Sequence, residues 1–179
     1  MLNKEEINRL IKKHGLDDFK WFNASEIVVS RWVRFKCQFG CGSYGKKGCC
    51  PPHVPSLESC REFFSEYTDA VLIHFSGYFK NRKEHDKWCR QNDRQLLKLG
   101  NDLFHMGYYK SFVIVSSTCR MCRDCPEDDG VCKNRLASRP TAEALGVDVF
   151  ATVRKLGYPI EVLKDYEQKA NRYGFILIE

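Results

Sequence analysis

The feature that most constrains this chain is a run of four cysteines near its middle, from Cys119 to Cys132. Cys119, Cys122 and Cys125 follow one another at Cys-x2-Cys-x2-Cys spacing, and Cys132 comes after a gap of six residues. Three thiolates at this spacing can point inward from one tight loop and hold three corners of a cubic iron–sulfur cluster, which a fourth cysteine completes. The gap leaves Cys132 enough chain to fold back, so the run predicts a [4Fe–4S] site.

Zinc is the alternative metal for this loop. Structural zinc sites usually take two pairs of ligands from separate knuckles, with a dozen or more residues between the pairs. Four cysteines in one short loop strain that arrangement without forbidding it. We therefore expect iron–sulfur here and keep zinc as the second interpretation.

A second cysteine cluster lies earlier in the chain, in the segment CQFGCGSYGKKGCCPP at residues 37–52. Its glycines allow the backbone to approach a metal centre closely and to aim amide N–H groups at the sulfurs. Cys37, Cys41 and one of the adjacent pair Cys49 and Cys50 are the expected ligands. We favour Cys50, because a proline follows it directly, as a proline also follows Cys125.

The fourth ligand of this first site is open. Ser56 is a good N-cap, which would place Cys60 at the end of the first turn of a helix, where the helix dipole stabilises a thiolate. Cys60 is thus a candidate ligand, and the alternative is that it belongs to the buried face of that helix. If Cys60 does not bind the metal, the cluster keeps one iron open to a substrate.

Composition and charge limit the remaining possibilities. A chain of 179 residues suits a single domain, 1–179, with metal loops at 37–60 and 119–132. The polar start of the chain and the lack of a long apolar run indicate a cytoplasmic protein without a membrane partner, where ten cysteines mean metal or redox chemistry rather than disulfides. The net charge of +6 is scattered among acidic residues, so we do not expect nucleic-acid binding.

The hydrophobic pattern predicts an α/β fold: a single three-layer-like domain with a central mixed sheet. A buried strand at 69–77, an amphipathic helix at 82–106 and a strand at 110–117 form a βαβ unit that delivers the chain to Cys119. Outside this unit, the expected helices cover residues 3–15 and 148–156, and the expected strands cover 26–36, 160–163 and 175–179. We expect the last two strands to form an antiparallel hairpin.

These motifs together resemble a family described as predicted metal-binding proteins (domain of unknown function 2284), found largely in archaea and anaerobic bacteria. The resemblance covers nearly the whole chain and implies metal binding through the cysteines. It rests on Cys37-x3-Cys41, Tyr44-Gly45-Lys46, Cys50-Pro51-Pro52, Ser56-Leu57-Glu58, Cys119-x2-Cys122-x2-Cys125-Pro126, Cys132, Arg139-Pro140 and the run from Glu143 to Phe150.

Two functions follow from these expectations. The first is a redox protein that carries one or two [4Fe–4S] clusters and passes single electrons to a partner protein. The second is an enzyme whose open-site cluster acts on a small-molecule substrate, with Tyr44, Lys46 and His53 near enough in sequence to donate protons or bind an anion. A zinc-binding interaction module is the third and weakest interpretation.

Overall fold

A four-stranded sheet with helices on both faces forms the protein. The computed structural model describes residues 2–122, 125 and 132–179. Within these residues the sheet has the strand order β1-β2-β4-β3, and each neighbouring pair is antiparallel. The elements are α1 (Lys4–Lys13), β1 (Phe19–Asn23), α2 (Arg31–Gly40), α3 (Leu57–Ser65), β2 (Asp69–Gly77), α4 (Arg82–His105), β3 (Phe112–Ile114), α5 (Val149–Lys155) and β4 (Ala170–Leu177), with single 3-10 turns at Ala24–Glu26 and Glu143–Leu145.

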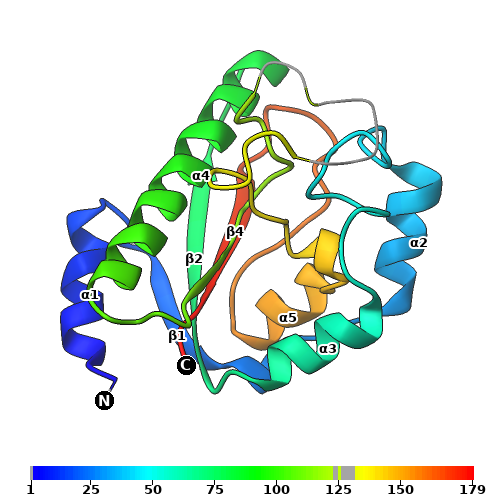
Figure 1. The fold of residues 1–179 in the computed structure, drawn as a ribbon. Helices are drawn as coiled ribbons and strands as arrows, with labels where there is room; N and C mark the ends of the chain where they lie inside the picture. The colour runs from blue at the N-terminus through cyan, green and yellow to red at the C-terminus, as the bar shows by residue number, and fades with distance from the viewer. Residues whose placement is uncertain (1, 123–124, 126–131) are drawn as a thin grey trace.

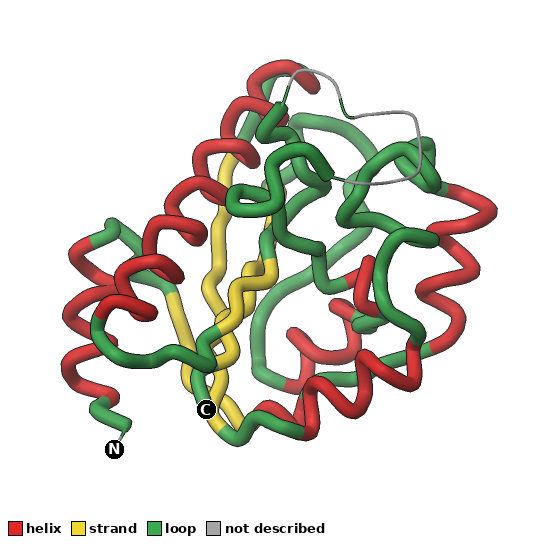
Figure 2. Tube along the Cα trace, in the orientation of Figure 1, coloured by secondary structure: helices red, strands yellow, loops and turns green. Residues whose placement is uncertain are grey.

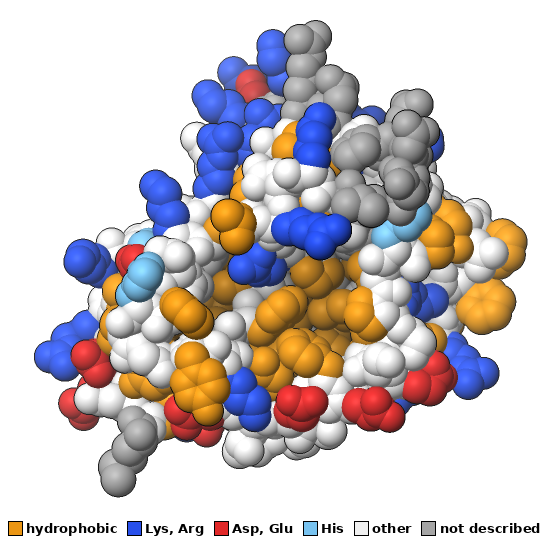
Figure 3. Space-filling view, viewed as in Figure 1, with side chains coloured by type: hydrophobic (Ala, Val, Ile, Leu, Met, Phe, Trp, Pro, Cys, Tyr) orange, Lys and Arg blue, Asp and Glu red, His pale blue; other side chains and the backbone are white. Residues whose placement is uncertain are grey.

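The sheet is buried on both faces, which gives the three layers that the sequence predicts (Figures 1 and 2). Side chains alternate along the central strand β2: Val71 and Ile73 pack with α1 and α4, whereas Ala70 and Leu72 belong to the core beneath α3 and α5. The α/β class is therefore confirmed. The face drawn in Figure 3 is hollowed near its centre, where hydrophobic side chains gather, with lysine and arginine side chains above them.

Local signals place most of the elements correctly. Asn3 caps α1 by accepting a hydrogen bond from the Glu6 amide, and Asp148 caps α5 in the same way. The predicted strand at 69–77 is β2, and the predicted helix at 82–106 is α4, which ends before Gly107 at a φ of 96°.

The sheet is antiparallel where we expected a mixed one. Strands β2 and β3 do run parallel, as a βαβ unit requires, but the C-terminal strand β4 lies between them and pairs with both. The apolar run from Phe175 to Ile178 explains this position, because a strand that is buried on both faces belongs in the middle of a sheet. Among the described residues, parallel pairing is limited to an isolated bridge between Val115 and Thr141.

Two predicted strands are wrong, and one strand is missing from the prediction. Residues 26–36 form an isolated bridge at Val29 and then helix α2, because the aromatic residues after Ser30 follow a helical period with Val33 on the buried side. Residues 160–163 form no strand, so β4 has no hairpin partner there. Strand β1 (Phe19–Asn23) was not expected, although it pairs with β2 over its whole length.

No helix in the described part of the chain is both long and apolar enough to cross a bilayer.

Candidate metal centre

The first cysteine loop begins on α2 and folds back beside it. Cys37 lies on the last turns of α2, and Cys41 is the residue that ends this helix. The chain then turns through Gly45, whose φ is 71°, and returns so that the Gly45 amide donates a hydrogen bond of 2.9 Å to the Pro51 carbonyl. This closure buries Cys50, whereas Cys37 is partly exposed and Cys41 is exposed.

The second loop follows β3. Cys119, Cys122, Cys125 and Cys132 are all partly exposed and unbridged, while residues 123, 124 and 126–131 of this loop lie outside the described part of the chain. The Asp93 carboxylate of α4 fixes the start of the loop. It accepts hydrogen bonds of 2.9 Å from the Ser116 amide, 2.8 Å from the Ser116 hydroxyl and 2.6 Å from the Ser117 hydroxyl.

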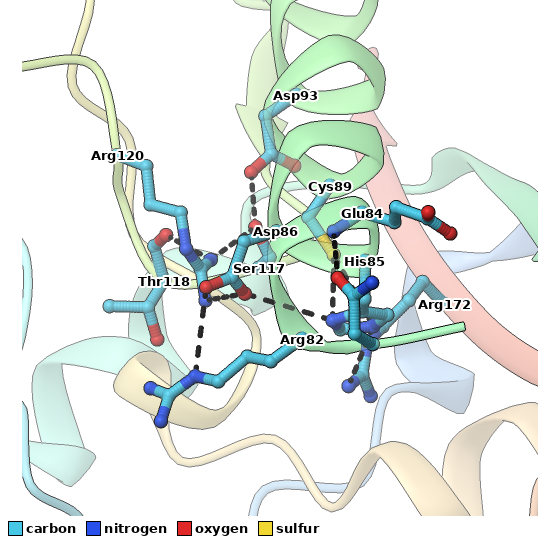
Figure 4. A network of polar contacts seen from close by, with 11 residues as sticks. Arg82, Glu84, His85, Asp86, Cys89, Asp93, Ser117, Thr118, Arg120 and Arg172 are labelled. Carbon is cyan, nitrogen blue, oxygen red and sulfur yellow. Dashed lines mark hydrogen bonds and ion pairs between the residues drawn. The ribbon is translucent and has the colours of Figure 1, made fainter. Parts of the chain in front are cut away.

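Arg120 ties the same loop to the start of α4. Its guanidinium forms an ion pair of 3.0 Å with Asp86 and donates a 3.1 Å hydrogen bond to the Ser117 hydroxyl. Figure 4 shows these contacts converging beside α4, with Asp93 and Asp86 on the helix and Arg120 reaching it from the loop. The cysteine loop therefore leaves the sheet from a fixed point.

The two cysteine loops meet, although the sequence separates them by about seventy residues. The Cys49 thiol lies near enough to the thiols of Cys119 and Cys50 for each to shift its pKa, and the Cys132 charge also acts on it. The thiol of Cys50 is close enough to Cys37, Cys41 and Cys119 for their charges to act on it. Both adjacent cysteines of the first loop therefore lie near Cys119, and Cys49 lies near Cys132 as well.

Burial and mutual contact shift the thiol pKa values in different directions. The contact with Cys49 and then burial raise the pKa of Cys119, and burial followed by the Cys41 charge raises the pKa of Cys37. The hydrogen bond from Cys49 lowers the pKa of Cys50 despite its burial. A bound cation would favour the thiolate form at every one of these positions, because metal ligands must give up their protons.

Cys60 lies apart from these thiols. It is 2% exposed, belongs to the core beneath α3 and contacts the Pro55 carbonyl at 3.8 Å. Burial raises its pKa, and the charged groups that act on it are Arg34, Arg61 and Glu58, with no cysteine among them. Its place agrees with the buried-face alternative considered from the sequence.

The other sequence candidates are distributed around the first loop. Tyr44 lines a cavity beside the cysteines. His53 Nε2 lies 3.3 Å from the Gly45 carbonyl, so His53 helps to hold the loop in place. Lys46 is exposed. No group of three or more His, Cys, Asp or Glu side chains within residues 2–122, 125 and 132–179 is arranged tightly enough to hold a single metal ion.

The cavity, of about 420 Å³, adjoins the cysteine loops. Cys37, Cys41 and Cys50 line it from the first loop, and His85 and Arg172 line it from α4 and β4. A volume of this size matches the pockets that bind small molecules. The cavity therefore gives a small molecule access to three of the predicted metal ligands.

The sequence prediction did not include the α4 side of this cavity. His85 is 8% exposed and Cys89 is fully buried, and the Cys89 sulfur lies 3.6 Å from His85 Nε2. Burial, and then the positive charge of Arg172, lower the pKa of His85. The sequence could have revealed these residues, because polar or reactive side chains occupy buried positions of an amphipathic helix at His85, Cys89, Asn92 and Asp93.

Comparison with known proteins identifies a metal-binding family, which agrees with the cysteine thiols as metal donors. No curated protein and no solved structure matches the chain significantly. Over residues 20–178, the chain matches a family described as predicted metal-binding protein (DUF2284). That span includes all ten cysteines and every described strand except the first residue of β1. The chain therefore belongs to the predicted metal-binding protein family DUF2284.

Proposed function

We propose that this protein binds one or two [4Fe–4S] clusters and transfers single electrons to a partner protein. The observation that supports the proposal is the meeting of two cysteine loops, distant in sequence, through the contact between Cys49 and Cys119. Cysteine thiols are soft donors, which favour iron–sulfur clusters or zinc over hard cations, and six of them act on one another here: Cys37, Cys41, Cys49, Cys50, Cys119 and Cys132. The spacing of Cys119, Cys122 and Cys125, with Cys49 beside this loop, favours iron–sulfur clusters over zinc.

The contacts also indicate how the thiols divide. The charges of Cys37, Cys41 and Cys119 act on Cys50, and we assign Cys50 to one group with Cys37 and Cys41. From their spacing in the sequence, we assign Cys119, Cys122, Cys125 and Cys132 to the second group, and Cys49 lies near Cys119 and Cys132. When bound, each cluster would accept or donate one electron at a time.

The role of the protein is to hold the loops and tune their surroundings. The ion pair with Asp86 fixes Arg120 beside the second loop. Because Asp86 neutralises the guanidinium, Arg120 positions this loop and adds no net positive charge to it. The Asp93 hydrogen bonds hold the end of β3 on α4, so that Cys119 begins from a constant position.

The test is to purify the protein without oxygen and record its absorption before and after a one-electron reductant. A bound [4Fe–4S] cluster gives a brown protein with broad absorption near about 400 nm that bleaches reversibly on reduction. A colourless protein with stoichiometric zinc would reject the proposal and favour the zinc-binding module. Serine variants of Cys119 and Cys50 should lose absorbance, whereas serine at the buried Cys89, outside both groups, should retain it.

A second function, that of an enzyme with an open-site cluster, is favoured by the cavity beside Cys37, Cys41 and Cys50. Cys60 lies in the core, where its charged neighbours are not cysteines, so the first group has three thiols that are near one another. In this alternative the cavity admits the substrate to the iron that lacks a cysteine ligand. A Cys60→Ala variant with unchanged iron content and spectra supports the open site, and loss of one cluster contradicts it.

A further inference from the structure

We infer that the cavity beside the first cysteine loop is a binding site for a small carboxylate with a short apolar tail, and that Arg172 is its anion-binding residue. The inference goes beyond electron transfer, because a carrier needs no such site. It depends on Arg172 and the apolar wall of the cavity and not on the cluster itself, so it can be tested separately from metal binding.

The charge of the cavity wall favours an anionic ligand. Its described charged side chains are Lys36, Arg120, Arg172 and Glu143. Arg120 is neutralised by Asp86 at 3.0 Å, whereas Arg172 forms no ion pair with any carboxylate of the described residues. Where no carboxylate of the described residues pairs with such a half-buried guanidinium, a ligand that supplies negative charge stabilises it.

His85 helps to hold Arg172 in position at the cavity. One of its terminal nitrogens lies 3.5 Å from His85 Nε2, and the two side chains are drawn together in Figure 4. The neighbouring Cys89 and the ring of Phe79, 5.2 Å from that of His85, hold the imidazole in place. A neutral His85 can accept a hydrogen bond from Arg172 and leave the rest of the guanidinium fork for a ligand.

The shape and polarity of the cavity suit a carboxylate better than a phosphate. A planar guanidinium binds a carboxylate with two parallel hydrogen bonds. Val33, Val147, Val149 and Phe150 also line the cavity and provide an apolar surface for a short tail. A phosphate dianion is a poorer match, because Arg172 offers a planar fork that suits a carboxylate, and the thiol side of the cavity contains Glu143 near Cys37.

The ligand would extend from Arg172 toward the thiols. Cys37, Cys41 and Cys50 line the same cavity as Arg172, but they come from a different part of the fold, α2 and the loop after it. A carboxylate held at Arg172 therefore presents its tail to the apolar wall and the first cysteine group. This placement is where a substrate of an open-site cluster would lie.

The experiment measures ligand-induced thermal stabilisation of the protein purified without oxygen, with butyrate, butyramide and inorganic phosphate as probes. Butyrate should raise the melting temperature in a saturable way, whereas the neutral amide and phosphate should have little effect. Arg172→Gln should weaken butyrate binding by about ten- to a hundredfold, the size expected for losing hydrogen bonds to a charged group. Arg172→Lys should recover part of the affinity.

Arg90→Gln is the matched control, because Arg90 is an exposed arginine on α4 that does not line this cavity. It should bind butyrate as the unaltered protein does. Equal butyrate affinity in Arg172→Gln and the unaltered protein overturns the inference, and so does the absence of any butyrate effect. Tighter binding of phosphate than of butyrate overturns the choice of a carboxylate. Iron and sulfide content, measured on the same samples, reports on the cluster independently.

Discussion

The attachment of β3 to α4 depends on Asp93, and removal of the Asp93 carboxylate should destabilise the whole protein. Asp93 is 1% exposed and accepts three hydrogen bonds, two from Ser116 and one from Ser117. Burial raises the pKa of Asp93, and the hydrogen bonds from Ser117 and Ser116 oppose that shift. The carboxylate is therefore the acceptor that satisfies the Ser116 amide in the interior.

The expected cost of Asp93→Ala follows from these three bonds. At about 0.5–1.5 kcal/mol each, their loss lowers the free energy of unfolding by about 2–4 kcal/mol, and the orphaned Ser116 amide places the value toward the upper end. For a protein of this size that corresponds to a fall in melting temperature of about 6–12 °C. Asp93→Asn retains one acceptor oxygen and should cost about 1 kcal/mol.

Urea unfolding followed by circular dichroism measures these differences directly. The exposed Asp17, for which the structure shows no ion pair or side-chain hydrogen bond within its described residues, supplies the matched controls Asp17→Ala and Asp17→Asn. Both should stay within about 0.5 kcal/mol of the unaltered protein. If Asp93→Ala is no less stable than Asp17→Ala, the argument that Asp93 anchors the start of the second cysteine loop is refuted.

Three further predictions follow. Gly100→Ala should destabilise the protein by about 1–3 kcal/mol in urea unfolding, although alanine normally favours a helix, because the added Cβ would lie 2.4 Å from Val113 Cγ2. Adding Val113→Ala to this variant should cost less than Val113→Ala costs in the unaltered protein, because it removes the clashing methyl group. A stabilised Gly100→Ala variant would contradict the packing. Cys49→Ser should reduce iron content more than Cys60→Ser does, and equal losses would argue against the contact between the loops. Burial and the hydrogen bond to Asp18 raise the pKa of Tyr158 to about 12, so the contribution of Tyr158 to stability is present below about pH 10 and is lost between there and about pH 12. In Tyr158→Phe the free energy of unfolding should fall less steeply over this pH range. An unchanged pH dependence of the free energy of unfolding would contradict this.

The sequence predicts those parts of the fold that local chemistry determines. The caps of α1 and α5 and the strong periodicity of α4 identify these helices to within a few residues, and the apolar run at 69–77 identifies β2. The position of β4 could not be predicted in the same way, because the pairing of strands distant in sequence depends on tertiary packing. Its apolar run from Phe175 to Ile178 predicted a strand, but as part of a hairpin with residues 160–163 and not in the middle of the sheet.

The sequence also located the cysteines but not the relation between them. The spacing around Cys119 marks a metal loop from one stretch of chain, whereas the contact between Cys49 and Cys119 depends on how the two loops leave the sheet and α2. Helix α2 was the main obstacle, because its β-branched and aromatic residues resemble a strand in composition while their spacing permits a helix. His85 and Arg172 come together only in the folded chain.

The central claim is that the two cysteine loops together hold iron–sulfur clusters. The most direct measurement is the number of iron atoms and acid-labile sulfide ions per chain in protein isolated and kept without oxygen. We predict equal amounts of iron and sulfide, at about four of each for one cluster or about eight of each for two. Protein that contains zinc and neither iron nor sulfide would contradict it.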